Sequence, residues 1–299
     1  MIIINLKGGL GNQMFQYALG YCLSKKKNTE LYLDTRLMEQ HKIKPPPRNV
    51  PRDFDLDIFG IEKKNARKID LIKTLQFSNN YRVRQIIAMN LDKLNLFCFY
   101  EKKRVFNKRI FSNNFKNIYL DGLWQSEKYF IDSRQDILNL FSFDKVKNNQ
   151  ENISLLNKIN FEKSVCLNVR RTDFITNPEH NVVNIDYYKK ALEKLKEKFS
   201  NDLDVFIFSD DLDWCKENFQ FLENKYFIEH KYAGNKFFNY LYLMSCFKIF
   251  IIPNSSFAWW AAWLSKKNNK VILVPEKWSG LVNQEFIDII PQNWTKIKF

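Results

Sequence analysis

The sequence predicts an α/β protein with two domains, each built around a parallel sheet. One observation is an apolar segment at residues 2–6 that leads through Gly8, Gly9 and Gly11 directly into a helical pattern. The other is a regular alternation of strand-length apolar segments with helical segments after residue 163. Strands that alternate with helices form parallel sheets, whose ligands bind at the carboxyl ends of the strands. A glycine turn between a strand and a helix is also typical of a backbone that holds phosphate.

The first half opens as a strand, a helix and a second strand. Its expected elements are a strand at 2–6, a helix at 12–26, a strand at 30–34, a helical basic region at 61–116, and a strand with a Gly122 turn at 118–130. Four prolines within seven residues predict a loop before the basic region, because proline breaks helices and central strands. The polar segment 142–152 has no apolar period, so we expect domains at residues 1–150 and 151–299.

The second half alternates more regularly, which predicts helices on both faces of a parallel sheet. The expected strands are 164–169, 204–209, 225–230, 248–252 and, as the last one, 270–274. The expected helices are 186–199, 235–247 and 255–265, with one more opening in the DDLDW segment.

The positive charge is concentrated in the first half. Residues 1–150 carry 27 Lys and Arg against 15 Asp and Glu, whereas residues 151–299 carry 20 against 18. The densest part is 61–116, with the runs Lys102-Lys103-Arg104 and Lys108-Arg109. Such a surface suits a membrane leaflet, a lipid phosphate or a nucleic acid, and we favour a membrane-facing or acceptor-facing role. A lysine-rich coding bias explains the lysine content but not its segregation.

Several classes of protein do not fit the sequence. No stretch approaches the roughly 20 apolar residues of a membrane span, and the first residues lack the pattern of a signal peptide. The five cysteines (Cys22, Cys98, Cys166, Cys215, Cys246) are scattered, so we expect core residues in a reducing, cytoplasmic compartment. No zinc, P-loop or serine-hydrolase motif is present.

Three sets of polar residues follow expected strands of the second half. Arg170, Arg171 and Asp173 come after 164–169, and paired guanidinium groups suit a diphosphate. Asp210 and Asp211 come after 204–209 at a helix start. Asn254, Ser255 and Ser256 open the helix at 255–265, whose free N–H groups would attract an anion.

Two competing patterns are weaker. Asp211-Leu-Asp213 matches the D-x-D pattern of metal-dependent sugar transferases, but this chain has three other matches, so we infer no metal. Gly9-x-Gly11 with Asp34 resembles a nicotinamide-binding pattern, but Met14 occupies the third glycine position. Trp259, Trp260 and Trp263 have helical spacing and are expected in the core.

The motifs together resemble glycosyltransferase family 11, and in particular a bacterial α-1,2-fucosyltransferase. They are GGLGNQMFQYA near the N-terminus, YLDGLWQSEKYF, the RRxD segment, SDDxxW, and NSSFxWWAAWL near the end. The order and spacing match over nearly the whole chain, and the basic region 61–116 is the least informative part.

This resemblance implies a GT-B-type fold with two Rossmann-like domains facing a cleft, GDP-L-fucose as donor, inversion at the anomeric carbon and no required metal or other cofactor. The C-terminal domain would bind the GDP-sugar, and the N-terminal domain would lie on the acceptor side. Arg170 and Arg171 would bind the diphosphate, with Ser255 and Ser256 beside it. Asp210 and Asp211 would shape the nucleotide pocket, and Asp173 would be the base. Gly9, Gly11, Asn12 and Gln13 would close over the donor.

One position departs from the family pattern. The family usually has His before the arginine pair, at the first position of H-x-R-R-x-D, and this chain has Asn168. Asn168 is still expected to hydrogen-bond the donor, but an amide does not take up a proton near neutral pH.

The expected function is transfer of L-fucose to a galactoside in bacterial surface glycan synthesis, such as a lipopolysaccharide O-antigen or a capsule. The acceptor would be a lipid-linked oligosaccharide, reached by peripheral contact of residues 61–116 with the inner face of the membrane. No nucleic-acid partner is expected, because no known nucleic-acid-binding motif is present. The alternatives are transfer of another sugar or linkage on the same scaffold, a nicotinamide-dependent oxidoreductase, and a basic nucleic-acid-binding protein.

Overall fold

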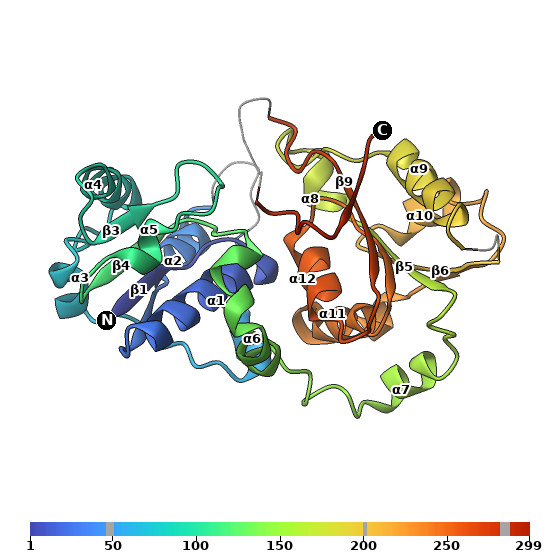
Figure 1. The fold of residues 1–299 in the computed structure, drawn as a ribbon, viewed down its shortest axis with the longest axis horizontal. Coiled ribbons are helices and arrows are strands. Elements are labelled where there is room, and N and C mark those ends of the chain that lie inside the picture. The colour runs from blue at the N-terminus through green and yellow to red at the C-terminus, as the bar shows by residue number, and fades with distance from the viewer. Residues whose placement is uncertain (46–50, 200–201, 282–287) are drawn as a thin grey trace. The chain divides into compact units, whose positions relative to one another are not determined.

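The computed structural model describes residues 1–45, 51–199, 202–281 and 288–299. The chain forms two compact units, the first made of Met1–Leu140 with Glu285–Pro291 and the second of Phe141–Gln284 with Gln292–Phe299 (Figure 1). The sequence places the boundary at residue 150, ten residues later in the chain. Each unit has a parallel sheet with helices on both faces, which confirms the α/β class and the two Rossmann-like domains of a GT-B-type fold.

The first unit contains a four-stranded sheet in the order β2-β1-β4-β3. Its strands are β1 (Ile2–Asn5), β2 (Leu31–Asp34), β3 (Cys98–Tyr100) and β4 (Ile118–Asp121), and all neighbours are parallel. Strand β3 corrects the expectation that the basic region is helical throughout. Cys98 and Phe99 are buried against β4, and this tertiary pairing overrides the local preference.

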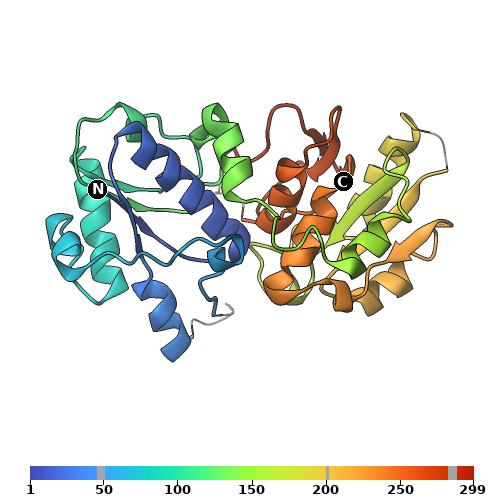
Figure 2. The ribbon, with the colours of Figure 1, turned by 90° about the horizontal axis from the view of Figure 1, so that it is seen from below.

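Side chains on opposite faces of β1 contact different helices of the first unit. Ile3 packs in a cluster with Leu71 of α3 (Lys68–Lys73) and with α4 (Tyr81–Lys93). Ile4 faces α1 (Leu10–Lys26), where a Cβ on Gly20 would come within 2.8 Å of it, so the close approach of helix and sheet requires glycine. Figures 1 and 2 show α1 across these strands, with α4 on the other side.

The other helices of the first unit are short. They are α2 (Arg36–Ile43), α5 (Arg109–Ser112) and α6 (Arg134–Leu140), with 3-10 turns at Leu56–Phe59, Glu127–Tyr129 and Ile131–Ser133.

The second unit contains a six-stranded parallel sheet in the order β10-β9-β8-β5-β6-β7. Its strands are β5 (Ser164–Val169), β6 (Asp204–Ser209), β7 (Lys225–Phe227), β8 (Ile249–Ile251), β9 (Val271–Pro275) and β10 (Thr295–Ile297). The expectation that 270–274 is the last strand is wrong, because β10 pairs with β9 at the sheet edge. This strand has only three residues, two of them exposed, so the sequence carries almost no apolar signal for it.

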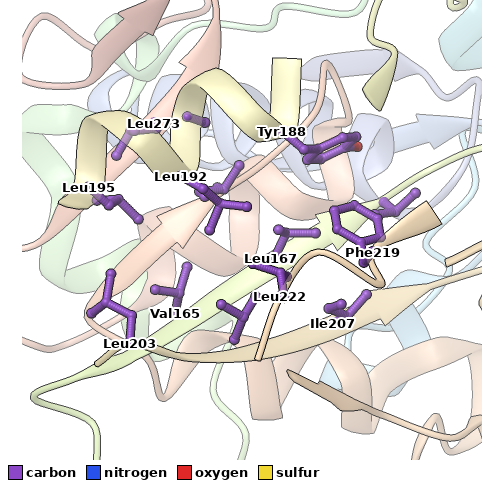
Figure 3. Packing of buried hydrophobic residues seen from close by; sticks show 14 of the residues in the cluster. Val165, Leu167, Tyr188, Leu192, Leu195, Leu203, Ile207, Phe219, Leu222 and Leu273 are labelled. Carbon is purple, nitrogen blue, oxygen red and sulfur yellow. The ribbon is translucent and has the colours of Figure 1, made fainter. Parts of the chain in front are cut away.

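Helix α9 (Ile185–Lys196) covers one face of this sheet and builds its core. The Asn184 side chain caps the helix by accepting hydrogen bonds from the amides of Asp186 and Tyr187. The buried positions 187, 188, 191, 192 and 195 repeat with helical spacing, and Figure 3 shows Leu192 and Leu195 on the side of α9 that faces the strands. Burial of a leucine side chain of this kind stabilises the fold by about 2 kcal/mol.

The remaining helices of the second unit are α7 (Gln150–Leu156), α8 (Thr172–Ile175), α10 (Leu212–Asn218), α11 (Phe238–Ser245) and α12 (Ser256–Leu264). Trp259, Trp260 and Trp263 of α12 are almost completely buried and contact one another, which confirms their expected place in the core. All five cysteines are free thiols, and all but the half-buried Cys246 are buried. No helix within the described ranges is long and apolar enough to cross a membrane.

Candidate functional site

The strand order of the second unit locates its natural ligand-binding edge. Along the chain, β6 and β7 are added on one side of β5, and β8, β9 and β10 on the other. In such a sheet the ligand binds at the carboxyl ends where the order reverses, between β5 and β8. Leu167 of β5 lies opposite Ile251 of β8, so Arg170 and Asn254 each follow three residues beyond a paired position. The sequence-predicted residues after β5, β6 and β8 therefore share this edge.

Asp210 fastens the loop after β5. Its carboxylate accepts hydrogen bonds from the amides of Arg171 (2.9 Å) and Thr172 (3.1 Å), and from the Thr172 hydroxyl. It also pairs with Nη1 of Arg170 at 2.9 Å. Only 10% of the Asp210 side chain is exposed, so these bonds are shielded from water. Asp210 thus holds the ends of β5 and β6 together and sets the position of the arginine pair.

Arg170 is engaged by two carboxylates. Besides Asp210, its Nη2 group donates to Oδ1 of Asp173 at 2.5 Å. The guanidinium also lies 5.4 Å from the ring centre of Phe174. Arg170 therefore neutralises the acidic cluster and orients Asp173, and only part of its charge is available to an added anion.

Arg171 is held by its Nε group and by the face of its guanidinium, which leaves its two terminal nitrogens available. Its Nε group donates to Oδ2 of Asp211 at 3.1 Å, and the guanidinium lies 3.9 Å from the ring centre of Trp214. Within the described ranges, neither terminal nitrogen of Arg171 has a hydrogen-bond partner. A guanidinium fixed at Nε and stacked on an indole presents its two Nη groups as a fork, which matches the oxygens of a phosphate.

Asp211 connects this arginine to a helix. Its other oxygen accepts the amide of Trp214 at 3.2 Å and caps α10. The same carboxylate thus fixes both the guanidinium and the helix that carries the indole beneath it. Among the described residues, no three His, Cys, Asp or Glu side chains gather as metal ligands. The metal-free chemistry expected from the resemblance stays a prediction.

The segment after β8 presents an uncapped helix start. Ser255 occupies the N-cap position of α12, but its side chain makes no capping hydrogen bond, and Ser256 is the first helical residue. The free amides at this end and the helix dipole favour an anion. Asn254 is buried and donates to the carbonyls of His180 (3.1 Å) and Trp278 (3.2 Å). Asn254 therefore fixes neighbouring loops against this helix.

The predicted turn of the first unit is built around Gly8. Gly8 has φ of +81°, and a Cβ there would lie 2.4 Å from Nδ2 of Asn12. The Asn12 side chain accepts a hydrogen bond from Gln125 at 2.7 Å. Gln13 is fully buried and bonds the backbone of Gly8 and of residues 53 and 55. Gln13 thus supports the turn from behind. Gly9 is the N-cap of α1, and Gly11 is buried in its first turn.

A scan against family models gives a match to residues 65–298, described as glycosyl transferase family 11. The chain belongs to glycosyl transferase family 11. This finding confirms the resemblance that the motifs indicate.

Two relatives match along nearly their whole length. An alpha-1,2-colitosyltransferase of Escherichia coli is 31% identical over 306 residues, covering 100% of this chain and 99% of the relative. The O-antigen biosynthesis glycosyltransferase WbnK of Escherichia coli is 32% identical over 297 residues, covering 91% and 93%. Among solved structures, the fucosyltransferase NodZ from Bradyrhizobium has a TM-score of 0.48 at 14% identity, covering 87% of this chain and 92% of that one.

Asn168, where family 11 usually has His, is directed into the fold. Its Nδ2 group donates to the Phe208 carbonyl at 3.1 Å and lies 4.0 Å from the sulfur of Met244. The side chain is buried, and the Asn168 carbonyl accepts from the Tyr188 hydroxyl at 3.2 Å. In this family 11 chain, Asn168 therefore joins β5 to β6. Its predicted contact with the donor stays a prediction.

A second polar cluster, which was not predicted from the sequence, lies at the carboxyl ends of β1 and β4 in the first unit. Lys7 pairs with Oδ1 of Asp121 at 2.8 Å, and the same oxygen accepts from Asn5 at 2.9 Å. Burial is the largest single influence and acts to lower the pKa of Lys7, but Asp121, Tyr81 and Glu101 together outweigh it and raise that pKa, so the ammonium is stable. The signal was available, because both charged residues stand directly at the ends of expected strands. Trp214 was likewise visible in the SDDxxW motif without an assigned role.

A nicotinamide-binding pattern would place Asp34 on a ribose. In this structure its carboxylate instead bonds other residues of the protein. It is buried, accepts from Nε and Nη2 of Arg36 at 2.8 and 2.7 Å, and accepts from the Tyr119 hydroxyl at 2.8 Å. Such a carboxylate serves the packing of the first sheet. This arrangement does not favour the oxidoreductase alternative.

Proposed function

We propose that this family 11 glycosyltransferase transfers L-fucose from GDP-L-fucose to a galactoside hydroxyl, with inversion and an α-1,2 linkage. The observation that carries the proposal is the open guanidinium fork of Arg171 at the ligand-binding edge of the second sheet. A fixed cation at this edge suits a sugar nucleotide, because the leaving diphosphate gains negative charge as the sugar departs.

The proposed reaction breaks the bond between the anomeric carbon and the β-phosphate oxygen. The acceptor hydroxyl oxygen forms the new bond from the opposite face, and GDP leaves with the electron pair of the broken bond. Arg171 would bind the departing diphosphate directly, and the uncapped start of α12 would add its dipole. Arg170 would contribute charge while it holds Asp173.

Asp173 is our proposed base for the acceptor proton. Its carboxylate bonds Arg170 at 2.5 Å, and its side chain is 21% exposed, so solvent reaches it. It would take the hydroxyl proton as the new bond forms and release that proton to water afterwards. Asp173→Asn keeps the shape but removes the base. We expect kcat to fall at least tenfold while the Kd for GDP changes little, and an unchanged kcat would remove Asp173 from the mechanism.

A second candidate donor is GDP-colitose, because the Escherichia coli relative that matches from end to end is an alpha-1,2-colitosyltransferase. Colitose is L-fucose without its 3-hydroxyl. A site that hydrogen-bonds this hydroxyl rejects the deoxy sugar strongly, whereas an apolar site rejects the extra hydroxyl by only about a hundredfold. The ratio of kcat/KM for the two donors therefore separates the candidates.

The relative named for O-antigen biosynthesis supports a place in surface glycan assembly. We propose that the acceptor is a galactose-containing oligosaccharide on a lipid carrier, and that the protein works in the cytoplasm, peripherally at the inner face of the membrane. The excess of basic residues in the first half supports this location.

The first experiment is calorimetry without metal, with GDP, GDP-L-fucose, GDP-colitose, UDP-galactose and NAD as ligands. We expect GDP and one of the two GDP-6-deoxysugars to bind, and Arg171→Ala to weaken GDP binding by about 10- to 100-fold, since charged hydrogen bonds contribute about 1.5–3 kcal/mol. Lys216→Ala, an exposed cation on the same helix as Trp214, is the matched control. Binding of UDP-galactose or NAD in place of GDP would overturn the proposal.

A further inference from the structure

The outer surface of α3 and α4 carries an unusual share of exposed apolar side chains. Of the 15 large apolar side chains that are exposed in the described chain, seven lie between residues 69 and 94, less than a tenth of the sequence. Ile69 and Ile72 belong to α3, and Phe77, 56% exposed, lies in the connection to α4. Such concentration on a short segment is typical of an interaction surface.

The apolar residues of α4 form one stripe. Val83 and Ile86 of α4 and its C-cap residue Leu94 are exposed, and their spacing of three and eight residues places them on the same side of the helix. Ile86 is 59% exposed. A neighbouring side of α4 contributes Ala88 and Leu91 to the core of the first unit. The helix thus has two apolar sides, and the core accounts for only one of them.

Basic side chains alternate with these apolar ones. Lys68 and Lys73 flank the two isoleucines of α3, and Arg82 and Lys93 flank the stripe of α4. Within the described ranges, none of these four forms an ion pair. An exposed cation without a counter-charge in its own protein is free to meet an anionic partner.

The acidic residues of the region do not neutralise this face. Residues 61–116 contain 14 Lys and Arg but four Asp and Glu. Asp70 is buried and bonded to Arg67, and Asp92 pairs with Arg109 at 3.5 Å. Glu101 accepts the amides of residues 123 and 124. The fourth acid, Glu62, is exposed and precedes α3 in the chain. The outer face of the two helices therefore keeps an excess of positive charge.

We propose that the outer face of α3, α4 and their connection is a docking surface for a membrane that contains anionic lipids (Figure 1). Apolar side chains enter the headgroup layer, and the lysines and arginine lie at the lipid phosphates. The exposed residues are mainly aliphatic, and a single-stranded nucleic acid would require aromatic side chains for stacking. The surface extends the proposed function by bringing the active protein to a lipid-linked acceptor, although vesicle binding itself needs neither donor nor acceptor.

The test is co-sedimentation of the full chain with vesicles of phosphatidylcholine, with and without phosphatidylglycerol. We expect binding that requires phosphatidylglycerol and weakens with salt. Lys68→Gln with Lys73→Gln should lower the partition coefficient by roughly 25-fold, at about fivefold per lysine. The matched control is Lys190→Gln with Lys196→Gln on α9 of the second unit, which should bind as the unmodified protein does.

The apolar contribution is tested by Phe77→Ser with Ile86→Ser. We expect at least a tenfold loss of vesicle binding with an unchanged melting temperature, because both side chains are already exposed to water. Phe221→Ser, 47% exposed in the second unit, is the control.

Full binding by both double variants would overturn the proposal, as would binding of single-stranded DNA but not of vesicles. Failure of sugar transfer with intact vesicle binding would refute the proposed donor chemistry alone.

Discussion

At the scale of single residues, what the candidate site can bind depends on the hydrogen bonds and ion pairs that each charged group already makes within the protein. Arg170 and Arg171 are adjacent and were assigned the same role from the sequence, yet Arg170 contacts two carboxylates and Arg171 keeps its terminal nitrogens open. An arginine whose Nε and ring face are fixed loses less conformational entropy when phosphate binds. The two positions are therefore expected to differ in function.

Trp214 is expected to position Arg171 for the donor. Trp214→Leu keeps an apolar side chain but removes the π face, and it should raise the Kd for GDP by about tenfold, the upper range of a cation–π contact. Trp214→Phe restores the aromatic face and should recover most of the affinity. Calorimetry with GDP measures both variants. Equal losses in the two variants would show that the indole acts through packing alone.

Asp34 is expected to make the first unit sensitive to acid. Burial acts to raise the pKa of Asp34, but Arg36 and the Tyr119 hydroxyl outweigh it and hold the pKa below 3.8. Its contribution to stability is therefore complete above about pH 4 and is lost as the pH falls through the lower, folded-state value.

Asp34→Asn should lower the free energy of unfolding by about 3 kcal/mol at pH 7, because it leaves Arg36 without its partner. The deficit should shrink as the pH falls below the folded-state pKa of Asp34, because the unmodified carboxylate is then protonated too. Denaturant titrations at several pH values test this, with the exposed Asp213→Asn as a control of little effect. A deficit that is constant with pH would contradict the assignment.

At the scale of elements, the strand ends and helix starts determine what each motif can do. The helix α12 begins without a side-chain cap, whereas α10 begins with Asp211 as its cap and α9 with Asn184. Other helices, among them α1 and α11, also begin without a side-chain cap, so the open start of α12 offers free amides to an anion without being unusual in this fold. The glycine turn before α1 is the corresponding element of the first unit.

Gly8 and Gly9 of that turn are expected to differ in how well they tolerate substitution by alanine. Gly8→Ala should destabilise the protein by about 1–2 kcal/mol, because φ is +81° and the new methyl group would collide with Asn12. Gly9→Ala is the matched control, since its φ is −78° and the nearest atoms around an added Cβ, those of Arg52, lie at 3.7 Å or more. Urea denaturation of both variants measures the difference. Similar stability in the two would contradict this reading of the turn.

At the scale of the whole molecule, each of the two units is built from two separate segments of the chain. Residues 288–291 complete the first unit, after which β10 closes the edge of the second sheet. Asp288 is nine-tenths buried and accepts the amide of Phe106 at 2.7 Å, and it pairs with Lys128. The last dozen residues therefore stabilise both units.

Asp288→Ala is expected to weaken the first unit selectively. Loss of a buried acceptor leaves the Phe106 amide unpaired, which costs about 2 kcal/mol. Hydrogen exchange should accelerate in peptides that contain residues 105–107 and 128, and it should stay unchanged in β5 and β6. Uniform acceleration in both units would show that they unfold together.

Much of the fold was predictable because its signals are local. Apolar segments of strand length and the helical spacing of α9 and α12 follow from side-chain periodicity, which a linear sequence displays directly. The sequence missed β3, which lies in a region expected to be helical and is stabilised by pairing with β4, and β10, of whose three residues two are exposed. The polar boundary segment was found, but the return of residues 288–291 to the first unit depends on contacts more than 150 residues apart along the chain.

The sequence by itself determined the α/β class, the family and the set of residues after β5, β6 and β8, because strand ends and motif spacing are properties of the chain alone. Only the tertiary structure decided which contacts each of these residues makes. It joined Arg170 to Asp173 and Asp210, stacked Arg171 on Trp214, and turned Asn168 toward Phe208. Hydrogen bonds and burial depend on which groups, distant in the sequence, come into contact. These contacts are determined only when the sheet has formed.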